Sequence, residues 1–185
     1  SVGTGGGALT LLGNNAFPTN GLIFIEDHVW VEGVIDSASL TIVSGRFPDN
    51  ASTRTSITIS NNLTYTNYDG QDVISLIAQN NINVGLKSPD ILQIDGALVA
   101  QNGRAGRYYY NSSCGTEHLR NTITLNGMIA TNQRYGFAYV SGLNGALVSG
   151  YNIRNIIYDA NLLYGPPPSF QLTSDKYTTI SWREL

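Results

Sequence analysis

The chain has 185 residues, a formal net charge of −3 and only 12% charged residues. A chain of this length most simply forms one domain, and its slightly acidic balance argues against a general polyanion-binding protein. The single cysteine, Cys114, excludes a disulfide bond within the chain.

Short β-branched runs separated by Asn, Asp or Gly recur along the sequence and predict an all-β fold. Each unit is an apolar run, a two-residue corner and a second run, and the corner residues tolerate a positive φ angle. No long apolar pattern with a period of about 3.6 residues is present, so we expect little helix. The clearest corners are Glu32-Gly33, Asn80-Asn81, Asp95-Gly96 and Asn126-Gly127.

The expected elements follow one another with loops between them. Residues 1–20 begin with a glycine-rich stretch, and we expect them to act as a cap or linker. The polar segments 46–56, 66–72 and 102–121 are expected to be loops. Strands are expected at 22–25, 29–35, 40–43, 57–65, 74–84, 91–101 and 123–130, with a further short strand at 136–140.

The recurrence of this unit favours a right-handed parallel β-solenoid, also called a β-helix, formed by residues 1–185 as a single domain. In a solenoid each run stacks in parallel on the matching run of the next coil, and the corner leads the chain into a second sheet. The alternative is an antiparallel sandwich of short strands, in which Asp-Gly corners would be hairpin turns.

The C-terminal residues 158–185 predict an irregular, Pro-rich strap. Pro166, Pro167 and Pro168 cannot donate to a sheet ladder and favour a stiff extended chain. We expect this strap to lie across the solenoid, to cover an edge, and to bury Phe170 and Trp182.

Several pieces of the sequence resemble a known family when taken in order. They are residues 21–33, 72–79, 94–102 and 158–170, and the closing Ser181-Trp182-Arg183-Glu184. The set is similar to the C-terminal region of bacterial envelope proteins related to PilX-like type IV pilus assembly proteins and to solenoid-bearing minor pilins of natural competence. This resemblance implies an extracellular location at the bacterial cell surface, pilus or envelope partners, a display or adhesion role, and a hydrophobic pilin-like helix preceding this segment as the membrane anchor.

The sequence offers no convincing catalytic or metal site. His28 has no nucleophile and orienting group beside it. Cys114, Glu117 and His118 supply fewer ligands than the four of a structural zinc site. We therefore expect a non-enzymatic protein without metal or cofactor. A glycosidase would need a pair of carboxyl groups, and the sequence offers Asp69 with Asp72 and Asp90 with Asp95. Both pairs fall at loops or corners, where Asp is expected for turn geometry.

The segment 102–121 is the best candidate binding surface, because it combines cations with aromatic side chains. Tyrosine stacking plus phosphate contacts hold single-stranded nucleic acid, and a glycan would use the same aromatic rings. Alternate residues of a strand point inward, so we expect at least one tyrosine to be a core residue; the simplest reading is a tyrosine-rich solenoid edge. The candidate binding residues are Arg104, Arg107, Tyr108, Tyr109, Tyr110, Arg120 and Arg134.

These observations leave three functions open. The leading one is a non-enzymatic structural or adhesive module of a pilus-associated or cell-surface protein. The second is a DNA receptor at a pilus tip, used in DNA uptake, which a charged groove beside residues 104–120 would favour. The third is a polysaccharide-binding or polysaccharide-active β-helix protein, and two facing carboxylates in a cleft would favour the enzymatic form.

Overall fold

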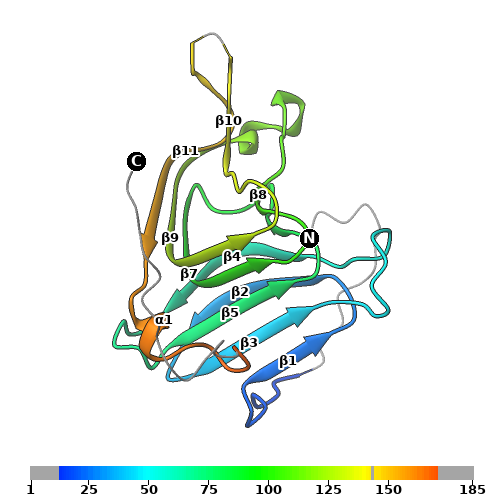
Figure 1. The fold of residues 1–185 in the computed structure, drawn as a ribbon. Helices are drawn as coiled ribbons and strands as arrows, with labels where there is room; N and C mark the ends of the chain where they lie inside the picture. The colour runs from blue at the N-terminus through cyan, green and yellow to red at the C-terminus, as the bar shows by residue number, and fades with distance from the viewer. Residues whose placement is uncertain (1–12, 143, 171–185) are drawn as a thin grey trace, which may run out of the picture.

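The computed structural model describes residues 13–142 and 144–170. Within these residues eleven strands form one sheet, and they pair mostly in parallel (Figure 1). Helix is limited there to α1 (Asn161–Tyr164) and two 3-10 turns, Ser112–Cys114 and Thr116–His118. The predicted all-β fold class is therefore confirmed.

Six strands form one parallel ladder, which we call the first ladder. Every strand in it pairs in parallel with the next, and leucine or isoleucine side chains repeat at matching positions, as in the pair Leu76 and Leu98. In order these strands are β1 (Leu22–Ile25), β3 (Ser39–Ser44), β5 (Val73–Ala78), β7 (Ile91–Ala100), β9 (Leu119–Thr131) and β11 (Leu147–Tyr158).

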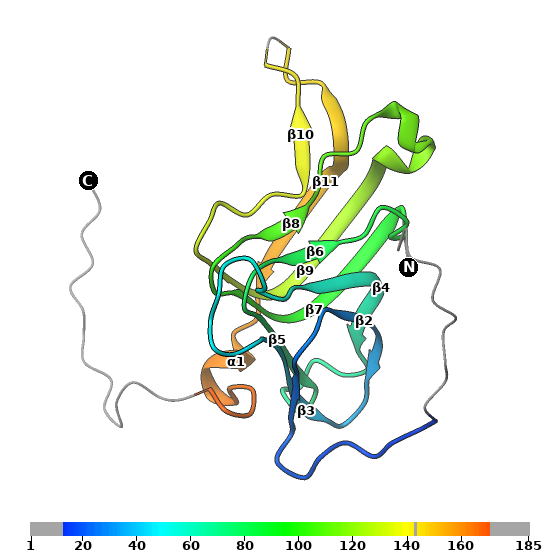
Figure 2. The same cartoon turned by 90° about the vertical axis from the view of Figure 1, so that its right-hand side faces the viewer.

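Four strands form a second parallel ladder, and the chain alternates between the two ladders from β1 to β9. The strands are β2 (Val29–Ile35), β4 (Ile57–Tyr65), β6 (Ile82–Val84) and β8 (Ala105–Arg107). Figure 2 shows these strands stacked in this order. β10 (Ala138–Val140) departs from the parallel pattern, because it pairs antiparallel with β11.

The hydrophobic core contains inward side chains from both ladders. Ile57, Ile59 and Ile82 come from the second ladder, and Leu76 and Leu98 come from the first. All five are almost completely buried. Burying a side chain of this size stabilises the fold by roughly 1.5–3 kcal/mol. Inward and outward residues alternate at the start of β4, whereas β5 is buried at almost every position.

The predicted corners are not hairpin turns. Gly33, Gly96 and Gly127 lie inside the continuous strands β2, β7 and β9, and these strands pair in parallel. Asn80 and Asn81, in contrast, do separate two strands, β5 and β6, so the expected run 74–84 is two elements. Antiparallel hairpins at Asp-Gly positions, which the sandwich alternative required, are absent from these described strands.

Most expected strands and loops are found, with two exceptions. The strands at 22–25, 29–35 and 57–65 have the expected bounds, those at 40–43, 91–101 and 123–130 differ by at most four residues at either end, and 46–56 and 66–72 contain no strand. The expected loop 102–121 includes β8 and the beginning of β9. The sequence analysis did not predict β11.

The described part of the C-terminal segment lies against the first ladder. The hydroxyl of Thr41 donates to the carbonyl oxygen of Pro168 at 2.6 Å. Half-buried Phe170 packs with Leu162 against Val73 in a small apolar cluster. This segment includes the short helix α1, which the prediction of an irregular strap did not include. Trp182 and most of the cap at 1–20 lie outside the described residues.

Candidate functional site

The outward face of β2, β4 and β6 forms the floor of a groove. Ile57 and Ile59 point into the core, so Thr58 between them points outward. Parallel register places Trp30 beside Thr58, Thr58 beside Asn83, and Asn83 beside Gly106. One outward row therefore runs across all four strands of the second ladder.

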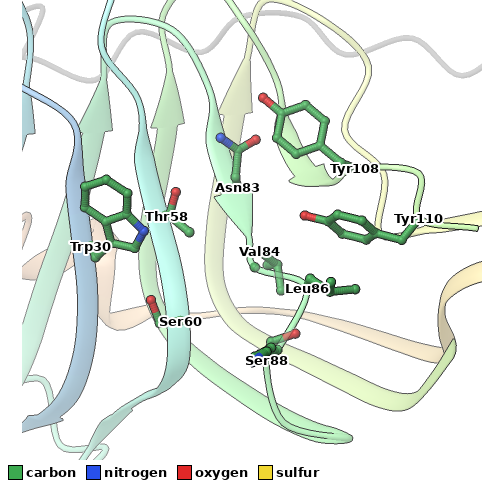
Figure 3. Close-up of a pocket in the computed structure, with 11 residues that line it drawn as sticks. Trp30, Thr58, Ser60, Asn83, Val84, Leu86, Ser88, Tyr108 and Tyr110 are labelled. Atoms are coloured by element: carbon green, nitrogen blue, oxygen red, sulfur yellow. The ribbon is translucent and has the colours of Figure 1, made fainter. Parts of the chain in front are cut away.

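The groove, which has a volume of about 280 Å³, is bounded by aromatic rings. Figure 3 shows Trp30 on one side, Tyr108 and Tyr110 on the other, and Thr58 and Asn83 between them. Trp30 is 57% exposed and Tyr108 is 46% exposed. Three strand spacings of about 4.8 Å place Trp30 about 14 Å from the Gly106 backbone.

The groove has hydrogen-bonding groups but little charge. Thr58, Ser60 and Asn83 supply hydroxyl and amide groups, and Lys87 is its only charged lining residue within the described chain. None of the described lining residues is Asp, Glu or His. The groove can thus stack and hydrogen-bond a ligand, but its lining holds no carboxylate pair for glycoside hydrolysis.

Arg107, predicted as a binding residue, is fully buried beneath this groove. Its guanidinium donates to the carbonyl oxygens of Leu86, Glu117 and His118 at 2.6–3.1 Å. Burial lowers the pKa of this guanidinium from its usual value. Arg107 therefore holds the loop against the strands and has no exposed surface to offer a polymer.

Arg120, also predicted to bind ligand, has a similar internal contact. Its Nη2 donates to the carbonyl oxygen of Leu86 at 3.2 Å, which also accepts from Arg107 at 3.0 Å. Ser88 is hydrogen-bonded to the Tyr151 hydroxyl at 2.8 Å. These contacts fix residues 86–88, which form one wall of the groove.

The three consecutive tyrosines have separate places. Tyr108 and Tyr110 line the groove, while Tyr109 makes an edge-to-face contact with Tyr139, with ring centres 5.4 Å apart. Tyr108 and Tyr109 are exposed and Tyr110 is partly buried, so none is the fully buried core residue that was expected. The three tyrosines follow the end of β8 at Arg107 and lie in irregular chain.

Arg104 and Arg134 lie in a second hollow, beside the groove. The hollow has a volume of about 710 Å³ and also contains Arg154, Tyr135 and Tyr139. Arg104 donates to the Tyr139 hydroxyl at 2.7 Å. The structure thus separates the predicted cations. Arg107 is buried and Arg120 is partly buried, and both bind the Leu86 carbonyl oxygen, whereas Arg104 and Arg134 line this hollow.

Sequence reasoning missed Trp30, Asn83 and Arg154 as surface-site residues. The signal for Trp30 was present, because a residue between Val29 and buried Val31 must face outward in a strand. Asn83 was placed in the strand expected at 74–84, but its outward position was not read as part of a site. Arg154 lies in β11, which the sequence did not predict.

His28 and Asp95, which were considered as catalytic residues, make hydrogen bonds within the fold. The His28 Nδ1 accepts a hydrogen bond from the Ser56 backbone N–H at 3.0 Å. Asp95 is fully buried and accepts hydrogen bonds from the Tyr65 backbone N–H and the Tyr68 hydroxyl. In residues 13–142 and 144–170, no three His, Cys, Asp or Glu side chains are grouped to hold a metal ion.

Comparison of the chain with protein-family models, curated proteins and solved structures finds no match. Among the helices that the structure describes, none is long and apolar enough to span a membrane.

Proposed function

We propose that this chain is a non-enzymatic adhesive module that binds a glycan chain across the groove between Trp30 and Tyr108. The observation that carries this proposal is the exposure of Trp30 at one side of a groove whose other side is aromatic. Large exposed apolar side chains grouped around a depression mark ligand-binding sites far more often than solitary ones do.

The residues of the groove suit the chemistry of a sugar chain. Tryptophan and tyrosine rings offer flat apolar faces for the apolar faces of sugar rings, while their polar atoms stay hydrated. Thr58 and Asn83, which lie between the rings, can donate and accept hydrogen bonds with sugar hydroxyls. The outward row of the groove runs across neighbouring strands, which suits a segment of polymer.

A binding role fits the groove better than catalysis. Hydrolysis of a glycosidic bond uses two carboxyl groups facing each other across the bond, and the described lining contains neither Asp nor Glu. The chain in this proposal therefore holds its glycan without changing it.

The proposed scaffold is a right-handed β-solenoid. Support comes from the regular alternation of the chain between the first and second ladders, with parallel pairing in each. Stacked coils would give a long flank of outward residues, which is the surface that such folds use for binding. The groove lies on such a flank.

The proposed setting is the outside of a bacterial cell. It rests on the resemblance of residues 21–33, 72–79, 94–102 and 158–170 to PilX-like and minor-pilin proteins. In this setting the module is displayed by pilus or envelope partners and attaches the cell to a glycan-covered surface.

A DNA receptor at a pilus tip is the second candidate function. Exposed Tyr108 and Tyr109, with Arg104 and Arg134 in the hollow, favour it. Two of the four predicted phosphate-binding arginines, Arg107 and Arg120, instead bind backbone carbonyls of the chain itself, which weakens this candidate.

Binding to immobilised oligosaccharides, followed by calorimetric titration of the best ligands, tests the proposed function. We expect Trp30→Ala to weaken binding at least about tenfold, equal to about 1.4 kcal/mol. Tyr164→Ala is the matched control, because Tyr164 is 89% exposed and outside the groove. Unchanged affinity of Trp30→Ala would refute the assignment of this groove.

A further inference from the structure

The arginine hollow continues the row of outward residues that forms the groove. The row from Trp30 through Asn83 to Gly106 extends to Gly136, because Gly106 and Gly136 form a parallel bridge. Arg104 and Arg134 each lie two residues before one of these glycines. The two arginines therefore occupy neighbouring positions of the stack, about 4.8 Å apart along it, beyond the aromatic groove.

The three arginines of the hollow have no carboxylate partner among the described residues. The ion pairs present there are Arg46 with Asp27 and Arg54 with Asp49, both elsewhere. Arg104 donates to the Tyr139 hydroxyl and the Arg107 carbonyl oxygen. These acceptors are neutral, so they orient the guanidinium without balancing its charge.

Arg154 is held in the same way. Its Nη1 donates to the carbonyl oxygens of Tyr151 and Asn152, both at 2.7 Å. A guanidinium has five N–H donors, so Arg154 keeps free donors for a ligand. Exposed Arg134 and Tyr135 line the same hollow.

An anion is the ligand that this arrangement favours. Three like charges around one hollow repel each other and create a positive local potential, although the whole chain has a net charge of −3. A guanidinium also matches the two oxygens of a carboxylate in a bidentate contact. The hollow therefore suits a carboxylate beside a groove whose described lining has Lys87 as its one charged residue.

We propose that the hollow of Arg104, Arg134 and Arg154 binds a carboxylate of the glycan that lies in the Trp30–Tyr108 groove, so that the ligand is an acidic glycan. This inference rests on the proposed function. The Tyr109–Tyr139 pair joins the two parts, because Tyr139 contacts Arg104 in the hollow and Tyr109 follows Tyr108 of the groove.

The distribution of charge favours an acidic glycan over single-stranded nucleic acid. Nucleic acid carries a phosphate at every residue, and proteins that bind it supply cations along the whole backbone path. Here the described groove lining has Lys87 as its only cation, whereas the hollow has three arginines. A glycan that carries carboxylates at intervals matches this uneven distribution of cations.

The test compares each acidic glycan with its own uncharged form. Galacturonan, alginate and hyaluronan oligosaccharides are titrated as free acids and as methyl esters, with single-stranded oligothymidylate as the nucleic-acid probe. We expect the best-binding free acid to bind about tenfold more tightly than its ester. Raising the salt from about 50 to about 200 mM should reduce this preference.

The variant Arg134→Gln/Arg154→Gln should remove the preference for the free acid while leaving binding of the ester unchanged. The matched control, Arg46→Gln/Arg54→Gln, removes two positive charges that lie outside the groove and the hollow, and it should retain the preference. Loss of the preference in both variants would show an effect of net charge alone and would overturn the assignment of the hollow.

The remaining outcomes separate this inference from the proposed function. Equal affinity for acid and ester would overturn the acidic ligand but leave glycan binding in place. No binding of either form would overturn both. Tighter binding of oligothymidylate than of every acidic glycan would overturn the inference in favour of a nucleic-acid receptor.

Discussion

The guanidinium carbon of Arg107 lies 4.8 Å from the centre of the Tyr110 ring. At this distance the cation is attracted to the face of the ring. Arg107 is buried below the groove and Tyr110 forms part of its wall. The contact therefore links the interior of the protein directly to the proposed glycan-binding surface.

Replacing Arg107 should destabilise the whole fold. Arg107→Leu would leave the carbonyl oxygens of Glu117 and His118 without their present donor, and the Leu86 carbonyl oxygen would keep only its bond from Arg120. A buried acceptor without a partner costs about 1–3 kcal/mol, so we expect a loss of about 3 kcal/mol or more in the free energy of unfolding. Urea unfolding measures this loss. Arg134→Leu, at an exposed position, should change the value by at most about 0.5 kcal/mol.

Gly127 should not tolerate even one added methyl group. It lies beside Gly96 of the neighbouring strand, and a Cβ at Gly127 would collide with the Gly96 carbonyl oxygen. Its φ angle of 155° also disfavours other residues. We expect Gly127→Ala to lower the free energy of unfolding by about 1–3 kcal/mol. In Gly136→Ala the new Cβ meets no atom within 4 Å, so a similar loss there would contradict this explanation.

Asp72 should make the stability depend on pH in acid. Burial raises the pKa of Asp72, but hydrogen bonds from the Thr66 hydroxyl and the backbone N–H groups of Asn67, Ser37 and Thr66 outweigh burial and lower it overall. The folded pKa lies below the unfolded value of about 3.9. Asp72 therefore stabilises the fold above about pH 4, and this contribution is lost as the pH falls through the folded pKa.

The measurement is urea unfolding of wild type and Asp72→Asn at a series of acidic pH values. The wild type should lose stability as the pH falls below about 4, and the variant should be less stable at neutral pH with a flatter dependence. Identical pH dependence in the two proteins would show that Asp72 does not contribute to it.

The sequence predicted the strands well where inward and outward residues alternate. The run Ile57-Thr58-Ile59 is an example, because a period of two leaves only one face for the core. The corner units were misread at Gly96 and Gly127, since residues that tolerate turns also serve where two strands come very close. β11 was missed because its outer half, Asn152–Tyr158, is exposed throughout and so lacks a pattern of alternating buried residues.

The candidate site was only partly predictable. Composition pointed to the segment 102–121, and Tyr108, Arg104 and Arg134 do lie at the surface described here. Residue type alone could not show that Arg107 points inward, because a buried arginine is rare and depends on carbonyl oxygens from other loops. Trp30 lies 78 residues before Tyr108 in the sequence and joins the site only through strand pairing.

Tyr108 and Tyr109 are adjacent in the chain, and replacing each in turn tests whether the glycan lies in the groove. This test rests on the proposed glycan binding. Tyr108 lines the groove, whereas Tyr109 packs edge-to-face on Tyr139, and both are about half exposed. We expect Tyr108→Ala to weaken glycan binding about tenfold, as loss of one stacking contact of about 1–3 kcal/mol would do. Tyr109→Ala should keep the affinity for uncharged methyl esters within about twofold. Calorimetric titration measures both, and a larger loss in Tyr109→Ala than in Tyr108→Ala would place the glycan outside the groove.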